Sequence, residues 1–204
     1  MQTEKLLQLL TEQSAEAINM ATQLKTASLQ SLTWRPAPGS WNTLECFEHL
    51  NLYGNFYIPA VEKAIGNAKP QKDTEFRSGI LGNYFANSMM PKEKLNRMKT
   101  FKDKDPIHAD LDISVIDTFI QQQLTTIDLL KKAKEVSLNK IKIPTSISSL
   151  IRLKLGDTFR FLINHTSRHI KQIKNIQEGY HQQVKGLNRT IQQSATGYKT
   201  ATIN

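Results

Sequence analysis

Three histidines stand at positions from which they could hold one metal ion. His165 and His169 lie four residues apart, so on a helix they would sit about one turn apart and direct ring nitrogens at the same point. His49 lies in an earlier segment with helical periodicity and can supply a third nitrogen from a facing helix. Three imidazole ligands leave at least one coordination position open, which is typical of a catalytic rather than a structural zinc site.

Each of these histidines also has a simpler interpretation, as a core residue held by a carbonyl or a carboxylate. Burial of all three takes six ring nitrogens out of water, and a metal ion offsets that cost by binding one nitrogen of each ring. The spacing alone leaves both interpretations open. The two other histidines, His108 and His181, have loop and tail surroundings and are expected at the surface.

The histidine pair is expected on the last of four helices. This helix should begin at Gly156–Asp157, where the Asp157 carboxylate suits an N-cap, and end at Gly179. Both histidines then replace apolar side chains on the face that should meet the core. The residues of that face are spaced three, four, four and three positions apart: Leu162, His165, His169, Ile173 and Ile176.

His49 is expected on the second helix, which should run from about Thr43 to Ile65. Asn42 and Glu45 have the spacing of a capping box, with the Asn side chain in the role of the usual Ser or Thr. Pro59 should kink this helix or mark a break. The inward stripe contains Cys46, His49, Tyr53 and Phe56.

The remaining segments complete a four-helix pattern. A first helix is predicted over residues 3–32, before the proline-containing loop 34–39, and a third begins near Asp112. Residues 66–111 lack sustained periodicity beyond a short helix near 92–100, which indicates a long crossover. The stripe of the third helix contains Ile116, Ile120, Leu124, Ile127 and Leu130.

Fold class and domains follow from these elements. The sequence predicts an all-α four-helix bundle over residues 1–181, with a long crossover between the second and third helices. Residues 182–204 are polar and are expected to form a flexible tail. Ile141 and Ile143 alternate with lysines, as in a short strand or a loop.

Composition limits the classes of function. Hydrophobic residues make up 39% and charged residues 22%, as in a globular protein. No apolar run approaches the ~20 residues that span a bilayer, and Met1–Leu10 carries Glu4 and Gln8 where a signal peptide would be apolar. We therefore expect a cytoplasmic protein without membrane association. Cys46 is the only cysteine, which excludes an intramolecular disulfide, and is expected to be a small buried residue.

The net charge of +9 is unevenly distributed along the chain. Residues 1–65 hold four basic and six acidic side chains, whereas residues 131–185 hold twelve basic and three acidic ones. Such a basic half can attract nucleic acid, an anionic membrane or an anionic small substrate, or can simply be a solvated face. No nucleic-acid motif accompanies the charge, so we expect no specific nucleic-acid binding.

Two sets of motifs resemble the DinB family. Arg35-Pro36-Ala37-Pro38-Gly39-Ser40-Trp41 leads into Glu45-Cys46-Phe47-Glu48-His49-Leu50, and Leu155-Gly156-Asp157-Thr158-Phe159 leads into the His165–His169 pair. The resemblance covers roughly residues 3–180. It implies an up-down-down-up bundle, a Zn, Ni, Fe or Mn ion on His49, His165 and His169, and often a homodimer. The superfamily includes thiol-dependent S-transferases and proteins described as metal-dependent hydrolases.

Several functions are compatible with such a site. As an enzyme, the protein would transfer a thiol or a related nucleophile, or alternatively hydrolyse a small-molecule substrate. The zinc-protease pattern is absent, because no glutamate lies between His165 and His169. Glu45 is the acidic candidate for orienting His49 or moving a proton, although it also suits the cap.

The competing function is non-enzymatic, with the ion stapling the bundle of an interaction protein. A fourth protein ligand such as Cys46 or Glu48 would favour that interpretation. In the enzyme, Arg168 and Lys171 are candidates for attracting a small anionic thiol, with Arg168 placed beside the site rather than in it.

Overall fold

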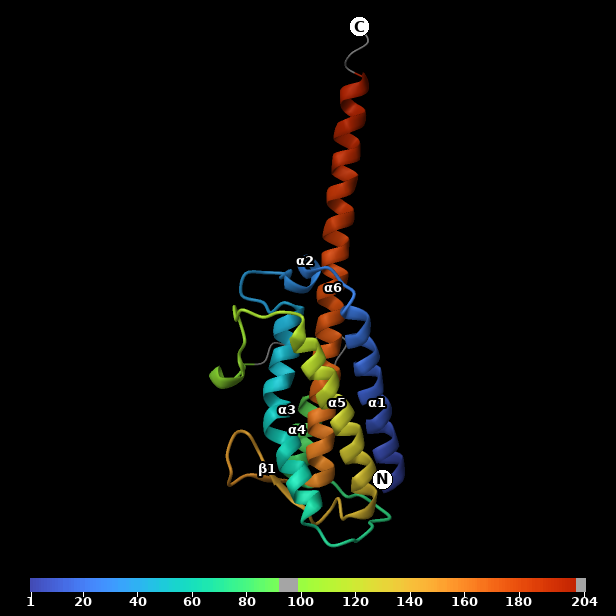
Figure 1. Ribbon diagram of the computed structural model, residues 1–204, viewed down its shortest axis with the longest axis vertical. Coiled ribbons are helices and arrows are strands. Elements are labelled where there is room, and N and C mark those ends of the chain that lie inside the picture. The colour runs from blue at the N-terminus through green and yellow to red at the C-terminus, as the bar shows by residue number, and fades with distance from the viewer. Residues whose placement is uncertain (92–98, 201–204) are drawn as a thin grey trace.

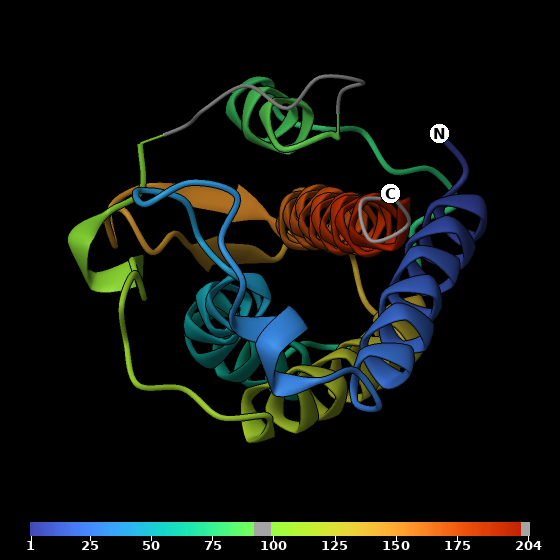
Figure 2. The ribbon, with the colours of Figure 1, turned by 90° about the horizontal axis from the view of Figure 1, so that it is seen from above.

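The computed structural model is mainly helical over residues 1–91 and 99–200, the part of the chain that it describes, with side chains described to residue 189. Long helices α1 (Thr3–Leu24), α3 (Thr43–Gly66), α5 (Ser114–Lys132) and α6 (Leu155–Thr200) lie side by side (Figure 1). α1 and α3 each pack against both α5 and α6. Viewed end-on, these helices surround a shared interior (Figure 2). In Figure 1, α1 and α6 run in one direction and α3 and α5 in the other.

Shorter elements complete the described part of the chain. The helices α2 and α4, two 3-10 turns and an antiparallel hairpin join the long helices. Their bounds are α2 (Leu29–Thr33), α4 (Ile80–Ser88), η1 (Lys102–Lys104), η2 (Ala133–Glu135), β1 (Lys142–Pro144) and β2 (Arg152–Lys154). The alternation around Ile143 therefore marks a strand rather than a loop. No described helix is both long and apolar enough to cross a bilayer.

Two clusters of buried side chains form the core, one toward each end of the long helices. Tyr53 and Leu162 belong to the first cluster, whereas Leu50 and Ile170 belong to the second. α3 and α6 contribute to both clusters. The histidine-bearing stretches of these two helices thus lie where the clusters meet, deep within the fold.

The first predicted helix is wrong in its extent. α1 ends at Leu24, and a separate short helix, α2, begins at Leu29. The side chain of Ser28 accepts a hydrogen bond from the backbone N–H of Ser31, which caps the new helix. A local cap therefore starts a second helix where periodicity alone suggested continuation.

The predicted end of the last helix is also wrong. α6 continues past Gly179 to Thr200, so residues 182–200 extend beyond the other helices as a single projecting rod (Figure 1). A Cβ atom at Gly179 would lie 3.0 Å from the Trp34 ring, so this glycine permits close packing rather than a stop. The Trp34 indole N–H donates to Gln183, which ties the helix down beyond that point. Flexibility of residues 182–204 stays a prediction.

The long crossover contains α4, which periodicity did not reveal. The helix expected near residues 92–100 falls largely on residues 92–98, outside the described residues. α4 packs against α6 and β2. Asp157 is not the N-cap of α6 but lies within its first turn, where its carboxylate accepts hydrogen bonds from the Gly79 N–H and the Ser78 hydroxyl. Asp157 therefore anchors the start of α4.

The second and third helices agree with the sequence with small differences. α3 continues through Pro59, and its N-terminus carries the predicted capping box. On α5 the buried face is rotated from the predicted stripe: Phe119 is fully buried, whereas Leu124 is exposed.

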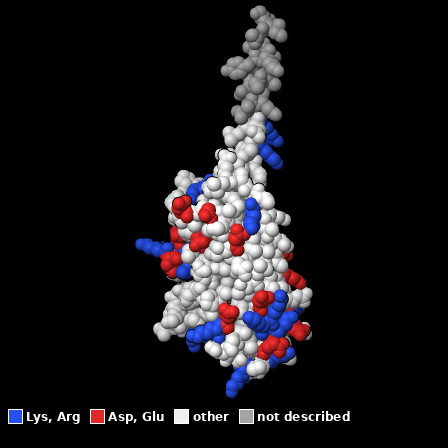
Figure 3. Space-filling view, viewed as in Figure 1, with Lys and Arg blue, Asp and Glu red and all other residues white. Residues whose placement is uncertain are grey.

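Lys and Arg are interspersed with Asp and Glu on the face seen in Figure 3, so on that face the basic surplus forms no patch of one sign.

Candidate metal centre

The local structure of α3 and α6 determines where the three histidines lie. Asn42 accepts from the Glu45 N–H at 2.9 Å, and the Glu45 carboxylate accepts from the Asn42 N–H at 2.9 Å. This box fixes the first turn of α3 and hence the direction of His49 one turn later. His165 and His169 lie on adjacent turns of α6, facing α3.

The Nε2 atoms of the three histidines converge. His49 Nε2 lies 3.1 Å from His165 Nε2, and His169 Nε2 lies 3.0 Å from His165 Nε2. A tetrahedral ion with bonds of ~2.0–2.1 Å to nitrogen separates its ligand nitrogens by roughly 3.3 Å. These two separations therefore stand within a few tenths of an ångström of what an ion such as Zn²⁺ requires, and all three ligand atoms lie within 4.8 Å of one another.

The second ring nitrogens show how two of the three imidazoles are oriented. His49 Nδ1–H donates to the backbone carbonyl of Lys104 at 2.6 Å, and His169 Nδ1–H donates to Gln172 Oε1 at 2.9 Å. In a neutral imidazole with the proton on Nδ1, Nε2 carries a lone pair. Within the described residues, His165 Nδ1 is buried without a hydrogen-bond partner.

These tautomers test whether the residues fit a metal ion. The Nε2 lone pairs of His49 and His169 both point toward His165 Nε2. A proton on that nitrogen can donate a good hydrogen bond to only one of them. Facing lone pairs repel one another, whereas a cation between them accepts all three. The donor set, which consists of neutral imidazoles in a buried site, therefore fits a divalent transition metal.

The electrostatic environment keeps all three histidines neutral. His49, His165 and His169 are at most 8% exposed. Burial lowers the pKa of His49 to about 4. Burial first, and second the repulsion that a charged ring would meet from the neighbouring histidines and Arg168, lower the pKa values of His165 and His169 well below the usual range. Neutral imidazole is the form that binds a metal, so little proton competition is expected at neutral pH.

The same shifts predict that the metal-free protein is destabilised by acid. The histidines bind protons near pH 6.5 when unfolded but only at lower pH when folded, so the unfolded state binds more protons between these values. The contribution of these histidines to the free energy of unfolding is therefore largest above about pH 6.5. It should fall as the pH drops toward 4, by up to ~1.4 kcal/mol per pH unit for each histidine.

Urea denaturation in the presence of a chelator, repeated from pH 7.5 to 4.5, measures this effect. His181→Gln is the matched control, because His181 is exposed and should leave the slope unchanged. A free energy of unfolding that stays constant over this range would contradict the buried neutral state of the three histidines.

Aromatic rings surround the histidine cluster. The Trp41 ring centroid lies 4.6 Å from that of His49 and 5.7 Å from that of His169. The Tyr53 centroid lies 4.6 Å from that of His165. Phe161 stacks on His165 at 6.0 Å, with the planes 16° apart. These rings exclude water and restrict the motion of the imidazoles.

Glu45 lies one turn before His49 on α3, but its carboxylate is fully engaged. Both oxygens pair with the Arg35 guanidinium, one accepts from the Asn42 N–H and the other from the His108 N–H. Hydrogen bonding to Glu45 raises the pKa of Arg35. These contacts support the capping and ion-pairing role of Glu45; its action as a proton carrier stays a prediction.

The other candidates lie outside the cluster. Among the described residues, the group of side chains that could hold an ion at this point consists of His49, His165 and His169, without Cys46 or Glu48. Cys46 is fully buried, as expected, and burial raises the pKa of its thiol. His108 and His181 are exposed, as expected. Arg168 is buried next to His169 in the chain, and burial lowers its pKa.

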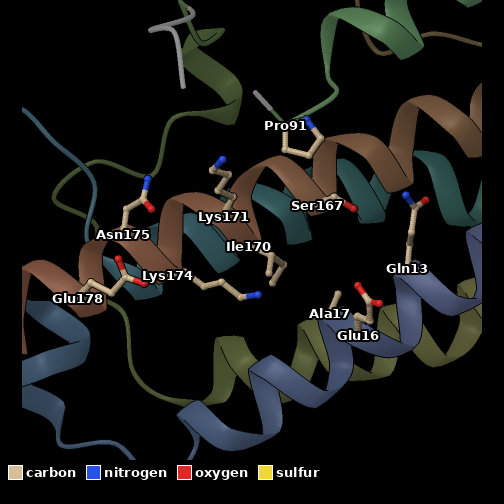
Figure 4. Close-up of a pocket in the computed structure, with 10 residues that line it drawn as sticks. All are labelled: Gln13, Glu16, Ala17, Pro91, Ser167, Ile170, Lys171, Lys174, Asn175 and Glu178. Carbon is tan, nitrogen blue, oxygen red and sulfur yellow. The ribbon is translucent and has the colours of Figure 1, made fainter. Parts of the chain in front are cut away.

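A cavity of about 500 Å³ lies elsewhere, along the seam between α1 and α6. Gln13 and Glu16 of α1 face Ile170 and Lys174 of α6 across it (Figure 4). None of the three histidines lines it. Its residues come from a different face of α6, and it does not bear on the metal centre.

Sequence reasoning missed the residues that support the ligands. Lys104 contributes a main-chain carbonyl, which has no sequence signature, from a crossover segment that lacks periodicity. Gln172 follows His169 by three residues, a helical spacing from which it was predictable. Trp41 precedes His49 by eight residues, and its position in the loop before α3 gave no indication that its ring covers the cluster.

The family comparison agrees with this arrangement. The chain matches the DinB superfamily over residues 3–173, a range that includes all three histidines. No curated protein and no solved structure matches the chain significantly. The match confirms the family suggested by the two sets of motifs. The chain therefore belongs to the DinB superfamily.

Proposed function

We propose that this protein binds one divalent transition metal, Zn, Ni, Fe or Mn, through His49, His165 and His169. The convergence of three Nε2 atoms, two of them fixed as lone-pair donors by acceptors at Nδ1, is the observation that carries the proposal. The coordination is open in this proposal, because the described residues offer three ligands at this point. An open site favours chemistry over a purely stapling role.

The finer predictions about assembly belong to the same proposal. The long helices form the up-down-down-up bundle of the family, a view supported by the directions of α1, α3, α5 and α6 in Figure 1. The protein acts in the cytoplasm as a homodimer on a small-molecule substrate, without specific nucleic-acid binding. These statements rest on the family and on the composition.

The reaction that the site suits best is transfer of a low-molecular-weight thiol to an electrophile. A bound divalent ion would act as a Lewis acid that stabilises the thiolate. Hydrolysis benefits from a general base near the nucleophile, and the acidic candidate on α3, Glu45, has both oxygens occupied by Arg35 and backbone N–H groups. Thiol transfer needs less help from a base, because a bound ion would lower the pKa of the thiol so that its proton is lost to solvent near neutral pH. The aromatic rings of Trp41 and Tyr53 would exclude water from the thiolate.

Steady-state assays test this function. Metal-loaded protein is mixed with a panel of small thiols and a model electrophile, and the rate of thiol consumption is compared with that of His169→Ala. We expect thiol-dependent turnover that the substitution reduces at least ~100-fold, because one ligand of three is lost. Metal-dependent cleavage of esters or amides without thiol transfer would contradict thiol transfer and show that the protein is a hydrolase. Inactivity in both assays would favour the non-enzymatic alternative.

A further inference from the structure

Residues 104–108 of the crossover contact the N-terminal part of α3 and the loop before it at three points. Their partners are Trp41, Glu45 and His49, which are spaced four residues apart. We propose that this segment, with Asp105 as its key side chain, positions His49 and Trp41 for metal binding, so that metal occupancy and ordering of the segment are coupled. The proposal rests on the proposed metal site, and its test separates the two.

The first contact acts on a ligand directly. The carbonyl of Lys104 accepts the Nδ1–H of His49 at 2.6 Å. This bond fixes the proton on Nδ1, leaves the lone pair on Nε2, and sets the ring direction. Partners of this kind raise the basicity of a metal-binding histidine and typically change metal affinity 10–100-fold. The main chain at Lys104 must therefore stay in place for His49 to be a good ligand.

The second contact acts through Trp41. The indole N–H of Trp41 donates to the Asp105 carboxylate at 2.9 Å. The same Asp105 oxygen accepts the N–H of Ile107 at 3.2 Å, which holds the segment in its turn. Since the Trp41 ring lies against His49 and His169, Asp105 restrains two ligands through one ring. Asp105 is in this sense a positioning residue.

The third contact holds the segment in a conformation that it would not favour alone. The backbone N–H of His108 donates to Glu45, whose carboxylate also pairs with Arg35. His108 has φ 61°, in the left-handed region that non-glycine residues adopt infrequently. Pro106, which is buried, restricts the chain just before it. The contacts with α3 therefore stabilise a backbone arrangement that would otherwise relax.

Coupling follows from these contacts by linkage. An ion on His49 Nε2 favours the tautomer that donates to the Lys104 carbonyl, so it favours the ordered segment. The ordered segment in turn favours the ligand geometry. Coupling free energy is reciprocal, so loosening the segment weakens metal binding and removing the metal loosens the segment.

Asp105→Ala and Trp41→Phe test the inference, with Asp110→Ala as the matched control because Asp110 is an exposed carboxylate five residues away. Zn²⁺ affinity is measured by competition with a chromophoric chelator. Hydrogen exchange of the backbone amides of Lys104, Asp105, Ile107 and His108 is measured with Zn²⁺ and with a chelator. We expect each variant to weaken Zn²⁺ binding about tenfold. The double variant should weaken it by less than the product of the two single effects, because Asp105 acts in part through Trp41.

In the unsubstituted protein, Zn²⁺ should slow exchange of the His108 amide at least ~10-fold, and Asp105→Ala should remove most of that protection. Unchanged affinity in both single variants would overturn the inference while leaving the metal site intact, as would exchange that does not respond to Zn²⁺. Absence of Zn²⁺ binding by the unsubstituted protein would overturn the metal site and the inference together. If Asp105→Ala fails to fold, the Trp41→Phe result decides.

Discussion

Replacing His165 by alanine is expected to weaken metal binding by two to three orders of magnitude. His165 is close to both other ligands, with its Nε2 at 3.1 Å from that of His49 and 3.0 Å from that of His169. Structural zinc sites with four ligands have apparent binding free energies of ~10–16 kcal/mol, or roughly 2.5–4 kcal/mol per ligand. Since each ~1.4 kcal/mol of binding free energy corresponds to a tenfold change in affinity, loss of one ligand weakens binding by about two to three orders of magnitude.

Affinity is measured by competition with a chelator of known affinity. His181→Ala is the control, since His181 is exposed and lies outside the cluster. His165→Gln retains most of the buried volume, so it separates loss of the ligand from a packing defect. Equal affinity in His165→Ala, His165→Gln and the unsubstituted protein would remove His165 from the site.

The helices that carry the histidines were predictable because their amphipathic patterns are strong. On α6 the stripe from Leu162 to Ile176 is buried throughout, and the Asn42–Glu45 box marks the start of α3 as expected. α4 was missed because several of its apolar side chains, including Ile80 and Tyr84, face solvent and give no periodic buried pattern. Tertiary packing overrides local signals where Trp34 meets Gly179.

The three ligands were predictable from residue type and spacing, but the residues around them were not. Arg35 and Glu45 are ten residues apart and meet only because the loop between α2 and α3 folds back. The carbonyl of Lys104 reaches His49 across 55 positions of sequence. Contacts of this kind depend on loop conformation and on main-chain groups, which no pattern of side-chain types encodes.

Replacing Glu45 by alanine is expected to destabilise the protein by about 3–5 kcal/mol. The Glu45 side chain is fully buried, and the Arg35 side chain is about one-fifth exposed. Removal of the Glu45 carboxylate therefore leaves the partly buried Arg35 guanidinium without its partner. The substitution also removes one half of the capping box and the acceptor for the His108 N–H. Equilibrium urea denaturation measures the free energy of unfolding.

Glu62→Ala is the matched control on the same helix, because Glu62 is exposed; we expect a change within about 0.5 kcal/mol. Arg35→Met in the Glu45→Leu background should recover part of the loss, since an apolar pair leaves no unpaired charge. A loss below ~1 kcal/mol for Glu45→Ala would show that the ion pair and cap contribute little to stability.

Elemental analysis of the protein, purified without a polyhistidine tag or added metal and compared with His165→Ala purified in parallel, tests the metal centre most directly. We predict about one divalent transition metal per chain in the unsubstituted protein and almost none in the variant. Equal metal content in the two proteins, or no uptake of Zn, Ni, Fe or Mn even after incubation with each ion and gel filtration, would contradict a metal centre at His49, His165 and His169.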